Sequence, residues 1–369
     1  MKVLKIAGIV VGVVVLAFAG LATYAYFKYF NVEGDYVANF IVQNPGKSAL
    51  YWVRNDTTVV AHNPDQKMPL ASTVKIIIAI EFSQQVSSGK IRPDAPVPLS
   101  EISRFYIADT DGGAHPAWLK HLQENKLAQN GQVPLLEVAR GMIRFSSNAN
   151  TEYLMWRLGL PAINANLSAL GLSRHDSLYP FISALYVCSE ENSAKGLQLM
   201  GMKLYKEKAG QYFEALKVDT TIKEQFTFAH LSAPVQRVWS DRLPGSTARE
   251  YNGLMKKIQS RTYFDPTTQQ TLESIMEWPM EAFDSNRQKY QHLGAKGGST
   301  AFVLTYALYA TDTAGNQTRL VFFFNDLNSV ENTLLQAQLT DFQQKVILGK
   351  EKEREEIVRI LNSSPSPPQ

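Results

Sequence analysis

The sequence predicts an α+β protein: an antiparallel five-stranded sheet flanked by helices, with an all-helical lobe inserted into the sheet lobe. Two strand-like runs near the amino end, 48–54 and 57–62, flank the turn dipeptide Asn55-Asp56. Three more strand-like runs, 291–296, 301–311 and 318–325, come near the carboxyl end, and residues 72–290 read as mostly helical. The simplest packing pairs the first hairpin with the last three strands.

The composition is that of a large globular protein. The 369 residues are 45% hydrophobic, enough for one large domain or two intertwined lobes. The net charge is +3 with dispersed Lys and Arg, which argues against a nucleic-acid partner. Cys188 is the single cysteine, so no intramolecular disulfide forms. The six histidines show no metal-ligand spacing, so we expect no metal and no cofactor.

The amino end predicts a membrane anchor. Residues 6–27 carry no charge, a length that is enough to cross a bilayer, and Lys2 and Lys5 precede them. These lysines favour an amino end in the cytoplasm. A cleavable signal peptide is the alternative, because Ala17-Phe18-Ala19 has the form of a cleavage site. The apolar run continues beyond Ala19, which favours a retained single-pass anchor, residues 1–30, in the inner (cytoplasmic) membrane and a periplasmic or extracytoplasmic catalytic part.

The first hairpin leads into a helix that reads as buried. Pro69 precedes residues 73–82, which are apolar except for Lys75 and Glu81. Residues 91–98 and 109–116 read as loops, and the second lacks the ligand spacing of a calcium loop.

Periodicity and capping predict the remaining helices. Residues 172–191 form a long irregular stretch, of the kind that often lines a cleft. Ser246 or Thr247 caps a helix that ends near Gln259. The other predicted helices span 135–145, 152–158, 161–170, 193–216, 218–240 and 267–276.

The two flanks of the domain differ from its interior. Residues 31–47 read as a polar linker, and 48–350 as the folded domain. An amphipathic helix over 332–348 is expected to continue into the charged residues 351–356. The carboxyl end, within 351–369, is a Pro/Ser-rich tail predicted to be disordered.

Ser72-x-x-Lys75 heads the buried helix and carries the chemistry. Residues three apart share a helix face, so the hydroxyl and the amine can meet. Burial disfavours the ammonium form, so Lys75 can act as a base toward Ser72. Chance also produces this motif, as the second copy, Ser87 to Lys90 in a polar segment, illustrates.

Two further motifs follow in order, Ser146-Ser147-Asn148 and Lys296-Gly297-Gly298-Ser299. Together with Ser72-x-x-Lys75 they resemble the set of the serine β-lactamase and penicillin-binding protein superfamily, closest to the class A β-lactamase-like serine hydrolases. The context matches as well, with a helix start, a loop between helices and the end of a strand. The resemblance spans residues 51–349, and 246–258 also resembles a class A helix.

The resemblance implies catalytic roles for four residues. Ser72 would be the acylated nucleophile and Lys75 its base. Ser146 would relay a proton to the leaving amine. Lys296 would place positive charge opposite Lys75 and help to keep one amine neutral.

The resemblance also implies how substrate is held. Backbone N–H groups of Ser72 and Ser299 would form the oxyanion hole. Asn148 would hold Lys75 and the substrate amide. Gly297 and Gly298 would let the substrate backbone lie close to the strand.

Three departures from the family pattern bear on function. Ser147 replaces an aspartate, and Gly297 replaces the Thr or Ser whose hydroxyl would bind a substrate carboxylate. No glutamate stands at 174–181, where the class A enzymes carry the one that activates the deacylating water. Asp176, Glu190 and Glu191 are the candidate substitutes, and without one the acyl-enzyme would clear slowly.

These observations predict a membrane-anchored periplasmic serine hydrolase that forms an acyl-enzyme on a small-molecule substrate, with weak β-lactam hydrolysis as the nearest activity. A D-Ala-type peptidase or esterase on cell-wall or other acyl substrates is the first alternative. A catalytically eroded binding module of the same fold is the second. Whether residues 219–243 cover the cleft is left open at this point.

Overall fold

The computed structural model describes residues 35–363. Two compact units are distinguished, one of residues Lys47–Ser329 and one formed by the two flanks, of which 35–46 and 330–363 are described. The predicted membrane segment 6–27 and the Ala19 site lie outside the described residues, as do residues 364–369 of the predicted tail. Between residues 35 and 363, no helix combines the length and the apolarity that a membrane span requires.

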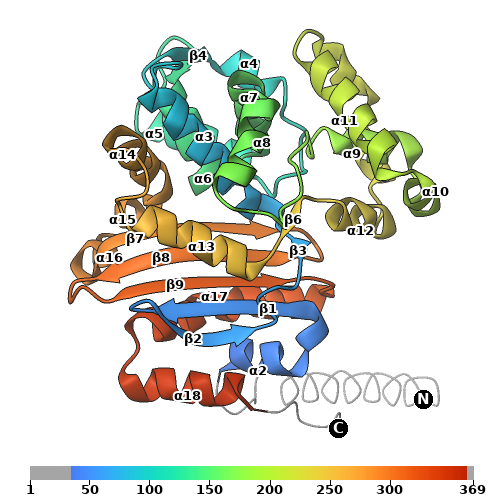
Figure 1. Cartoon of the computed structure of the whole chain (residues 1–369). Helices are drawn as coiled ribbons and strands as arrows, with labels where there is room; N and C mark the ends of the chain where they lie inside the picture. Colours follow the sequence, from blue (N-terminus) through green and yellow to red (C-terminus); the bar gives the residue numbers. More distant parts are fainter. Residues whose placement is uncertain (1–34, 364–369) are drawn as a thin grey trace, which may run out of the picture. The chain divides into compact units, whose positions relative to one another are not determined.

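The five-stranded antiparallel sheet is confirmed. Its strand order is β2-β1-β9-β8-β7, which pairs the first hairpin with the last three strands (Figure 1). Asn55 and Asp56 both have positive φ, 47° and 60°, as a tight hairpin turn requires. Strand β7 forms one edge, and Gly297 on it pairs with Tyr306 on β8. The strands span β1 Ser48–Arg54, β2 Thr57–His62, β7 Tyr290–Ser299, β8 Leu304–Asp312 and β9 Gln317–Phe324.

The middle of the chain forms the helical lobe. Its first part holds β3 Met68–Pro69, η2 Ala71–Val74, α3 Lys75–Ser87, β4 Pro96–Pro98, α4 Leu99–Ser103, α5 Ala114–Glu124, β5 Gln132–Pro134, α6 Leu135–Arg144, α7 Asn148–Leu158 and α8 Leu160–Ala169. Its second part holds α9 Ala184–Glu191, α10 Ala194–Leu199, α11 Met202–Leu216, η3 Thr220–Gln225, η4 Phe228–His230, α12 Ala233–Asp241 and β6 Gly245–Ser246. Helices α13 Ala248–Gln259, α14 Pro266–Met276, α15 Trp278–Ala282 and α16 Asp284–Lys289 then lead back to the sheet.

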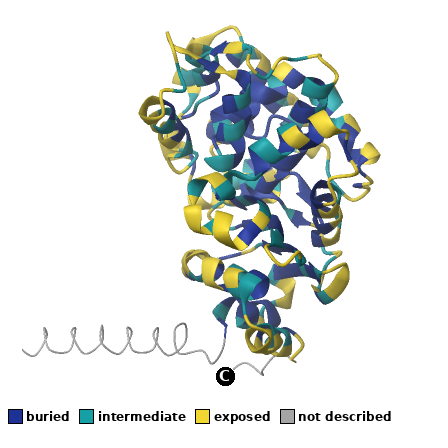
Figure 2. Ribbon diagram, turned by 90° about the vertical axis from the view of Figure 1, so that its left-hand side faces the viewer, coloured by how far each residue is buried: buried dark blue, intermediate teal, exposed yellow. Residues whose placement is uncertain are grey.

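Helix α3 is the buried helix that the sequence predicts. Residues 76–80 are fully buried, so consecutive positions on every face of this part of the helix are packed. Glu81 is tolerated because its carboxylate accepts hydrogen bonds from Asn166 and Gln85. Buried residues fill the interior, and exposed ones lie on the outer helix faces (Figure 2).

Helix α13 covers one face of the sheet (Figure 1). Asn252 donates a hydrogen bond to the carbonyl of Tyr51 on β1, and Gln259 donates one to the carbonyl of Ala310 on β8. The Thr247 hydroxyl caps the helix by accepting from Glu250 N, so the predicted cap is present. The two hydrogen bonds from Asn252 and Gln259 tie α13 to the sheet.

The flanks differ from the sequence-based expectation. Within the expected linker 31–47, residues Tyr36–Gln43 form helix α2, because Asp35 caps Ala38 N and the apolar residues of the helix are buried. Residues 351–356 do not continue the preceding helix α17 (Ser329–Leu348). They begin a separate helix, α18 Glu351–Leu361, after Gly349, and the Glu353 carboxylate accepts from Lys350 N at the start of this helix at 2.6 Å.

Smaller differences lie in the helical lobe. Helix α7 begins at Asn148 rather than 152, because the Ser147 side chain caps it. Helix α5 begins inside the expected loop 109–116, where Asp111 accepts from Ala114 N and His115 N. Residues 218–240 form two short 3-10 turns before α12, and the irregular stretch 172–191 ends in α9.

Candidate active site

Ser72 lies in a tight turn that is tied to the sheet. The turn is the 3-10 segment η2, and Ala71 before Ser72 has φ +45°, a conformation that costs about 1–3 kcal/mol and must be held by its surroundings. The Thr305 hydroxyl on β8 lies 2.7 Å from Leu70 O and 2.8 Å from the Thr73 hydroxyl, both buried. These bonds fix the nucleophile turn against the sheet.

Strand β7 passes directly behind this turn. A Cβ atom on Gly298 would lie 2.5 Å from the backbone N of Ser72 and 2.8 Å from that of Thr73. Only glycine therefore allows this approach. Ser299, the predicted second oxyanion donor, is the exposed last residue of the same strand, and its role remains a prediction.

Lys75 is fully buried at the start of α3. Its Nζ donates to Ser146 O at 2.7 Å and to Asn148 Oδ1 at 2.9 Å, and lies 3.4 Å from Ser146 Oγ. Burial, and next the charge of Lys296, hold the pKa of Lys75 well below its usual range. A neutral amine uses two N–H groups for these carbonyl oxygens and keeps one lone pair free as a base.

Lys296 approaches the same serine from the sheet. Its Nζ lies 3.0 Å from Ser146 Oγ and also donates to Gly297 O. Burial lowers the pKa of Lys296 to about 7. The hydroxyl of Ser146 thus stands between two amines of low basicity. It can accept a proton from either amine and pass its own proton on to a leaving group, as a relay requires.

The four predicted catalytic residues are brought together from three distant segments: the η2–α3 start, the turn before α7, and strand β7. One expected contact is missing: in the described part of the chain, no hydrogen bond joins Ser72 Oγ to Lys75 Nζ. Catalytic hydrogen bonds are often long without substrate and tighten in the complex. Ser72 itself is half-buried, so its hydroxyl remains accessible to a substrate.

The second motif has strained geometry. Ser146 has φ +68°, the left-handed region that a non-glycine residue rarely occupies. Ser147 and Asn148 follow it into helix α7, where the Thr151 hydroxyl donates to Ser147 O at 2.8 Å. The cap on α7 therefore fixes the position of Ser146, the serine expected to relay a proton.

The three acids considered for deacylation all lie away from Lys75. Asp176 pairs with Lys67 and accepts from Gly245 N. Glu190 pairs with Lys208 and accepts from the Tyr212 hydroxyl. The carboxylate of Glu191 lies against Gly196. The structure brings none of them into contact with Lys75.

A different acid, Glu152, is buried one turn after Asn148 on α7. It accepts hydrogen bonds from Ile182 N at 3.0 Å, Ser183 N at 2.7 Å and the Ser183 hydroxyl. Burial raises the pKa of Glu152 to about 7. Sequence analysis missed this residue, although a lone acid followed by Tyr153, Leu154 and Met155 was a usable signal.

Residues 182–243 begin at this anchor and contact two turns that lie far apart in the sequence. Lys223 donates to Ser103 O, and Arg104 donates to Lys217 O. At the other end, the Ser240 hydroxyl lies 2.8 Å from the Thr300 hydroxyl, just beyond β7. The segment left open by the sequence, 219–243, therefore connects the 103–104 turn to the end of the strand that carries Lys296.

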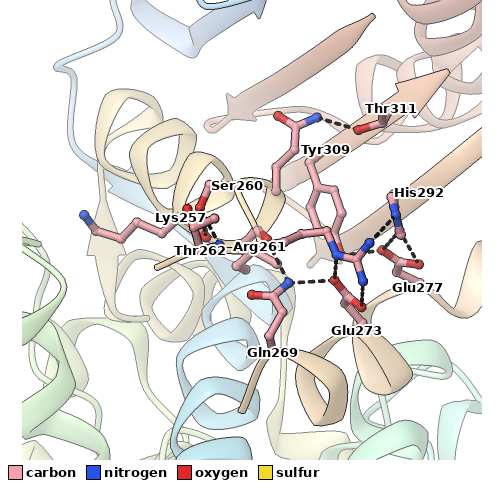
Figure 3. A network of polar contacts seen from close by, with 12 residues as sticks. Lys257, Ser260, Arg261, Thr262, Gln269, Glu273, Glu277, His292, Tyr309 and Thr311 are labelled. Atoms are coloured by element: carbon pink, nitrogen blue, oxygen red, sulfur yellow. Dashed lines mark hydrogen bonds and ion pairs between the residues drawn. The ribbon is translucent and has the colours of Figure 1, made fainter. Parts of the chain in front are cut away.

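One trio of side chains in the described residues has metal-ligand proximity, namely Glu273, Glu277 and His292. Figure 3 shows the Arg261 guanidinium pointing into it. Arg261 pairs with Glu273 at 2.6 Å and donates to His292 Nε2 at 2.8 Å. His292 Nδ1 and the Tyr309 hydroxyl both lie 3.1 Å from Glu277. The donor atoms are thus already used by an arginine and by one another.

Comparison with known proteins agrees with this geometry. The chain matches no curated protein sequence. It is similar in fold to a β-lactamase from Sphaerobacter thermophilus DSM 20745 (TM-score 0.53, 15% identity, covering 85% of this chain and 96% of that one). A β-lactamase from Burkholderia vietnamiensis gives TM-score 0.52 at 12% identity, covering 85% and 96%. The structure of PBP-A gives 0.50 at 16%, covering 83% and 93%.

Identities this low establish the fold alone. The sequence match to a family is broader: the model of the β-lactamase enzyme family covers residues 34–280, more than half of the chain. These residues include Ser72, Lys75 and the Ser146 loop, and the resemblance stated from the three motifs is confirmed. The chain belongs to the β-lactamase enzyme family.

Proposed function

We propose that this protein is a membrane-anchored, extracytoplasmic serine hydrolase that opens β-lactam amides through an acyl-enzyme on Ser72 and clears that acyl-enzyme slowly. The observation that carries the proposal is the Ser146 hydroxyl, placed within 3.4 Å of Lys75 Nζ and 3.0 Å of Lys296 Nζ. Burying two amines beside one hydroxyl is costly. A protein that had lost catalysis and only bound ligands would not be expected to retain this arrangement.

In the proposed reaction, Lys75 acts first as a base and then as an acid. Neutral Lys75 takes the Ser72 proton as the oxygen attacks the carbonyl, and N–H groups of Ser72 and Ser299 bind the oxyanion. Lys75 then returns the proton through Ser146 to the leaving nitrogen. In a β-lactam that nitrogen stays attached, so the adduct retains every atom of the substrate.

We expect slow hydrolysis of the acyl-enzyme because of where the acidic residues lie. Asp176 and Glu190 have partners away from Lys75, and the carboxylate of Glu191 lies against Gly196. Glu152 is occupied by Ile182 and Ser183. No described acid contacts Lys75 and is free to activate water, so hydrolysis of the ester would depend on a weaker base.

Intact-mass spectrometry of the full chain in detergent, with benzylpenicillin, tests the proposal. The wild type should gain one intact penicillin mass and lose it over a much longer time than it took to gain it. Ser72→Ala should gain nothing. Ser87→Ala is the matched control, because it removes the serine of the second Ser-x-x-Lys, which hydrogen bonds Asp265 instead. An unlabelled wild type, or labelling that survives Ser72→Ala, would overturn the proposal.

A second candidate substrate class is favoured by the edge strand. Gly297 lacks the hydroxyl expected to bind a carboxylate, and a Cβ there would lie 2.9 Å from the ring of Tyr306. An aromatic ring beside the catalytic strand suits a neutral amide or ester. Benzylpenicillin and its methyl ester form a matched probe pair: similar acylation rates would support this class. A tenfold or greater preference for the free carboxylate would exclude it.

A further inference from the structure

His115 is a buried imidazole that the proposed reaction leaves without a role. It lies in the first turn of α5, is 1% exposed, and its Nδ1 is 3.0 Å from the hydroxyl of Ser147. Ser147 is the residue next to the relay serine. It is also the residue that replaces the family aspartate, so the contact lies at a departure from the family pattern.

The hydrogen bonds assign the proton on this ring. Asn150 Nδ2 donates to Val138 O at 3.0 Å, so its Oδ1 must be the acceptor toward Ser147. The Ser147 hydroxyl therefore gives its single proton to Asn150 Oδ1, at 2.8 Å. Its oxygen accepts from Asn150 N at 3.3 Å and, in this network, from His115, which then carries the proton on Nδ1. The Nε2 atom is buried and has no hydrogen-bond partner.

The ring is held in place on several sides. The Asp111 carboxylate accepts from His115 N at 3.0 Å and from Ala114 N at 3.1 Å, which fixes the start of α5. The rings of Tyr106 and Trp118 lie 4.7 Å and 5.4 Å from the imidazole. Burial lowers the pKa of His115, which keeps the ring neutral. A fixed neutral imidazole is a rigid donor.

The His115 side chain contacts Ser147, which follows Ser146 in a strained turn. Ser146, with φ +68°, must present its hydroxyl to both lysines, and left-handed geometry persists only when neighbouring contacts enforce it. Backbone contacts hold one side, since Lys75 binds Ser146 O and Thr151 binds Ser147 O. The side chain of Ser147 is held by Asn150 and His115 alone among the described residues.

We propose that His115 is a positioning residue for acylation: its Nδ1–H fixes Ser147 and thereby aims the Ser146 hydroxyl between Lys75 and Lys296. The inference rests on the proposed function and extends it to a residue that never touches the substrate. Removing the donor should slow the acylation step and leave non-covalent binding of the β-lactam unchanged.

The test compares three histidine variants of the full chain with benzylpenicillin. His115→Ala should lower the first-order acylation rate constant by about 10²-fold, the scale of a 1 Å misplacement, with little change in the dissociation constant of the non-covalent complex. His115→Asn should restore most of the rate, because its side-chain amide places an N–H where Nδ1 stands. His62→Ala is the control, since this half-buried imidazole on β2 also has an unpartnered Nε2.

Thermal unfolding separates positioning from folding. If both His115 variants unfold at similar temperatures but only Ala is slow, the proposal stands. Equal rates in the wild type and His115→Ala would overturn it, as would an Asn variant as slow as Ala at equal stability.

A measurement independent of acylation completes the test. Nitrogen-15 NMR of the imidazole should show a protonated Nδ1 and an unprotonated Nε2 in the wild type, and Ser147→Ala should change the Nδ1 signal. If the wild type is not acylated, the proposed function fails on that ground. The NMR result then decides the His115–Ser147 contact separately, and an Nε2-protonated ring would overturn it.

Discussion

At the scale of single residues, the site depends on two buried lysines, Lys75 and Lys296, whose pKa values are lowered. Transfer of an ammonium from water to a protein interior costs several kcal/mol, and the group loses its proton instead. Lys75 and Lys296 share this condition, and Ser146 is the hydroxyl between them. Burial lowers the pKa of Lys75, and the resulting neutral amine can serve as the proposed base. The same burial should lower the stability of the folded protein.

Replacing Lys296 with Met should reveal that cost. The pKa of Lys296 is about 7 in the folded protein and 10.5 in the unfolded chain, so between these pH values the unfolded state binds more protons. Stability of the wild type should rise with pH in this window, by up to about 1.4 kcal/mol per pH unit from this group. Below pH 7 both states are protonated, and the contribution is constant.

Urea unfolding at pH 7, 8.5 and 10 measures the effect. The stability advantage of Lys296→Met over the wild type should be largest at pH 7 and shrink toward pH 10, while the tyrosines titrate alike in both proteins. An advantage that does not depend on pH would contradict the lowered pKa.

At the scale of elements, the site is a junction where the η2 turn, strand β7 and helix α7 meet. The junction is narrow because Gly298 places β7 against the backbone of Ser72. It is held from the helical side by Glu152, which ties α7 to the start of residues 182–243. A small displacement of β7 or α7 should therefore slow acylation without changing the fold.

Gly298→Ala should abolish or strongly slow acylation. The new Cβ would lie 2.5 Å from Ser72 N, and backbone atoms on both sides cannot give way without moving β7. Gly253→Ala in α13 is the matched control, because a Cβ there meets nothing within 4 Å. The control should gain about 0.5–1 kcal/mol of stability and keep its acylation rate. Equal acylation in the two variants would contradict the close approach.

Glu152→Gln should change how stability depends on pH. The pKa of Glu152 is about 7 in the folded protein and 4.5 in the unfolded chain, so the folded state binds more protons between pH 4.5 and 7. The wild type should lose stability from this group as pH rises through that window, and Gln should not. Melting temperatures at pH 5 and 7.5 measure the difference, and parallel pH dependences in the two proteins would exclude the buried, raised-pKa carboxylate.

At the scale of the whole molecule, the sheet is built from both ends of the larger unit, and the helical lobe is the chain between them. The proposed catalytic residues come from both parts, with Ser72 and Ser146 in the helical lobe and Lys296 on the sheet. The smaller unit adds α2, α17 and α18, in which Lys345 of α17 pairs with Asp35, the cap of α2.

The apolar segment 6–27 is the basis of a prediction for the full chain. Its length suits a bilayer, so the full protein should sediment with membranes and resist alkaline extraction. A variant that lacks residues 2–34 should be released in soluble form with unchanged benzylpenicillin acylation. Recovery of the full chain in the soluble fraction would argue against the anchor, and a shortened soluble product would indicate cleavage near Ala19.

The sequence by itself determined the five strands, the buried helix α3, the cap of α13 and the order of the three motifs. The strands, the helix and the cap depend on periodicity and turn chemistry within a few neighbouring residues. The order of the motifs can be read directly along the sequence. The tertiary structure alone decided that residues 36–43 form helix α2, that α18 is separate from α17, and that Asp176, Glu190 and Glu191 lie away from Lys75. It alone paired His115 with Ser147 and Glu152 with Ser183. Each of these pairings joins residues about 30 positions apart. Packing of α5, α7 and the segment after residue 182 buries these polar groups side by side, and buried polar groups must then form hydrogen bonds with one another.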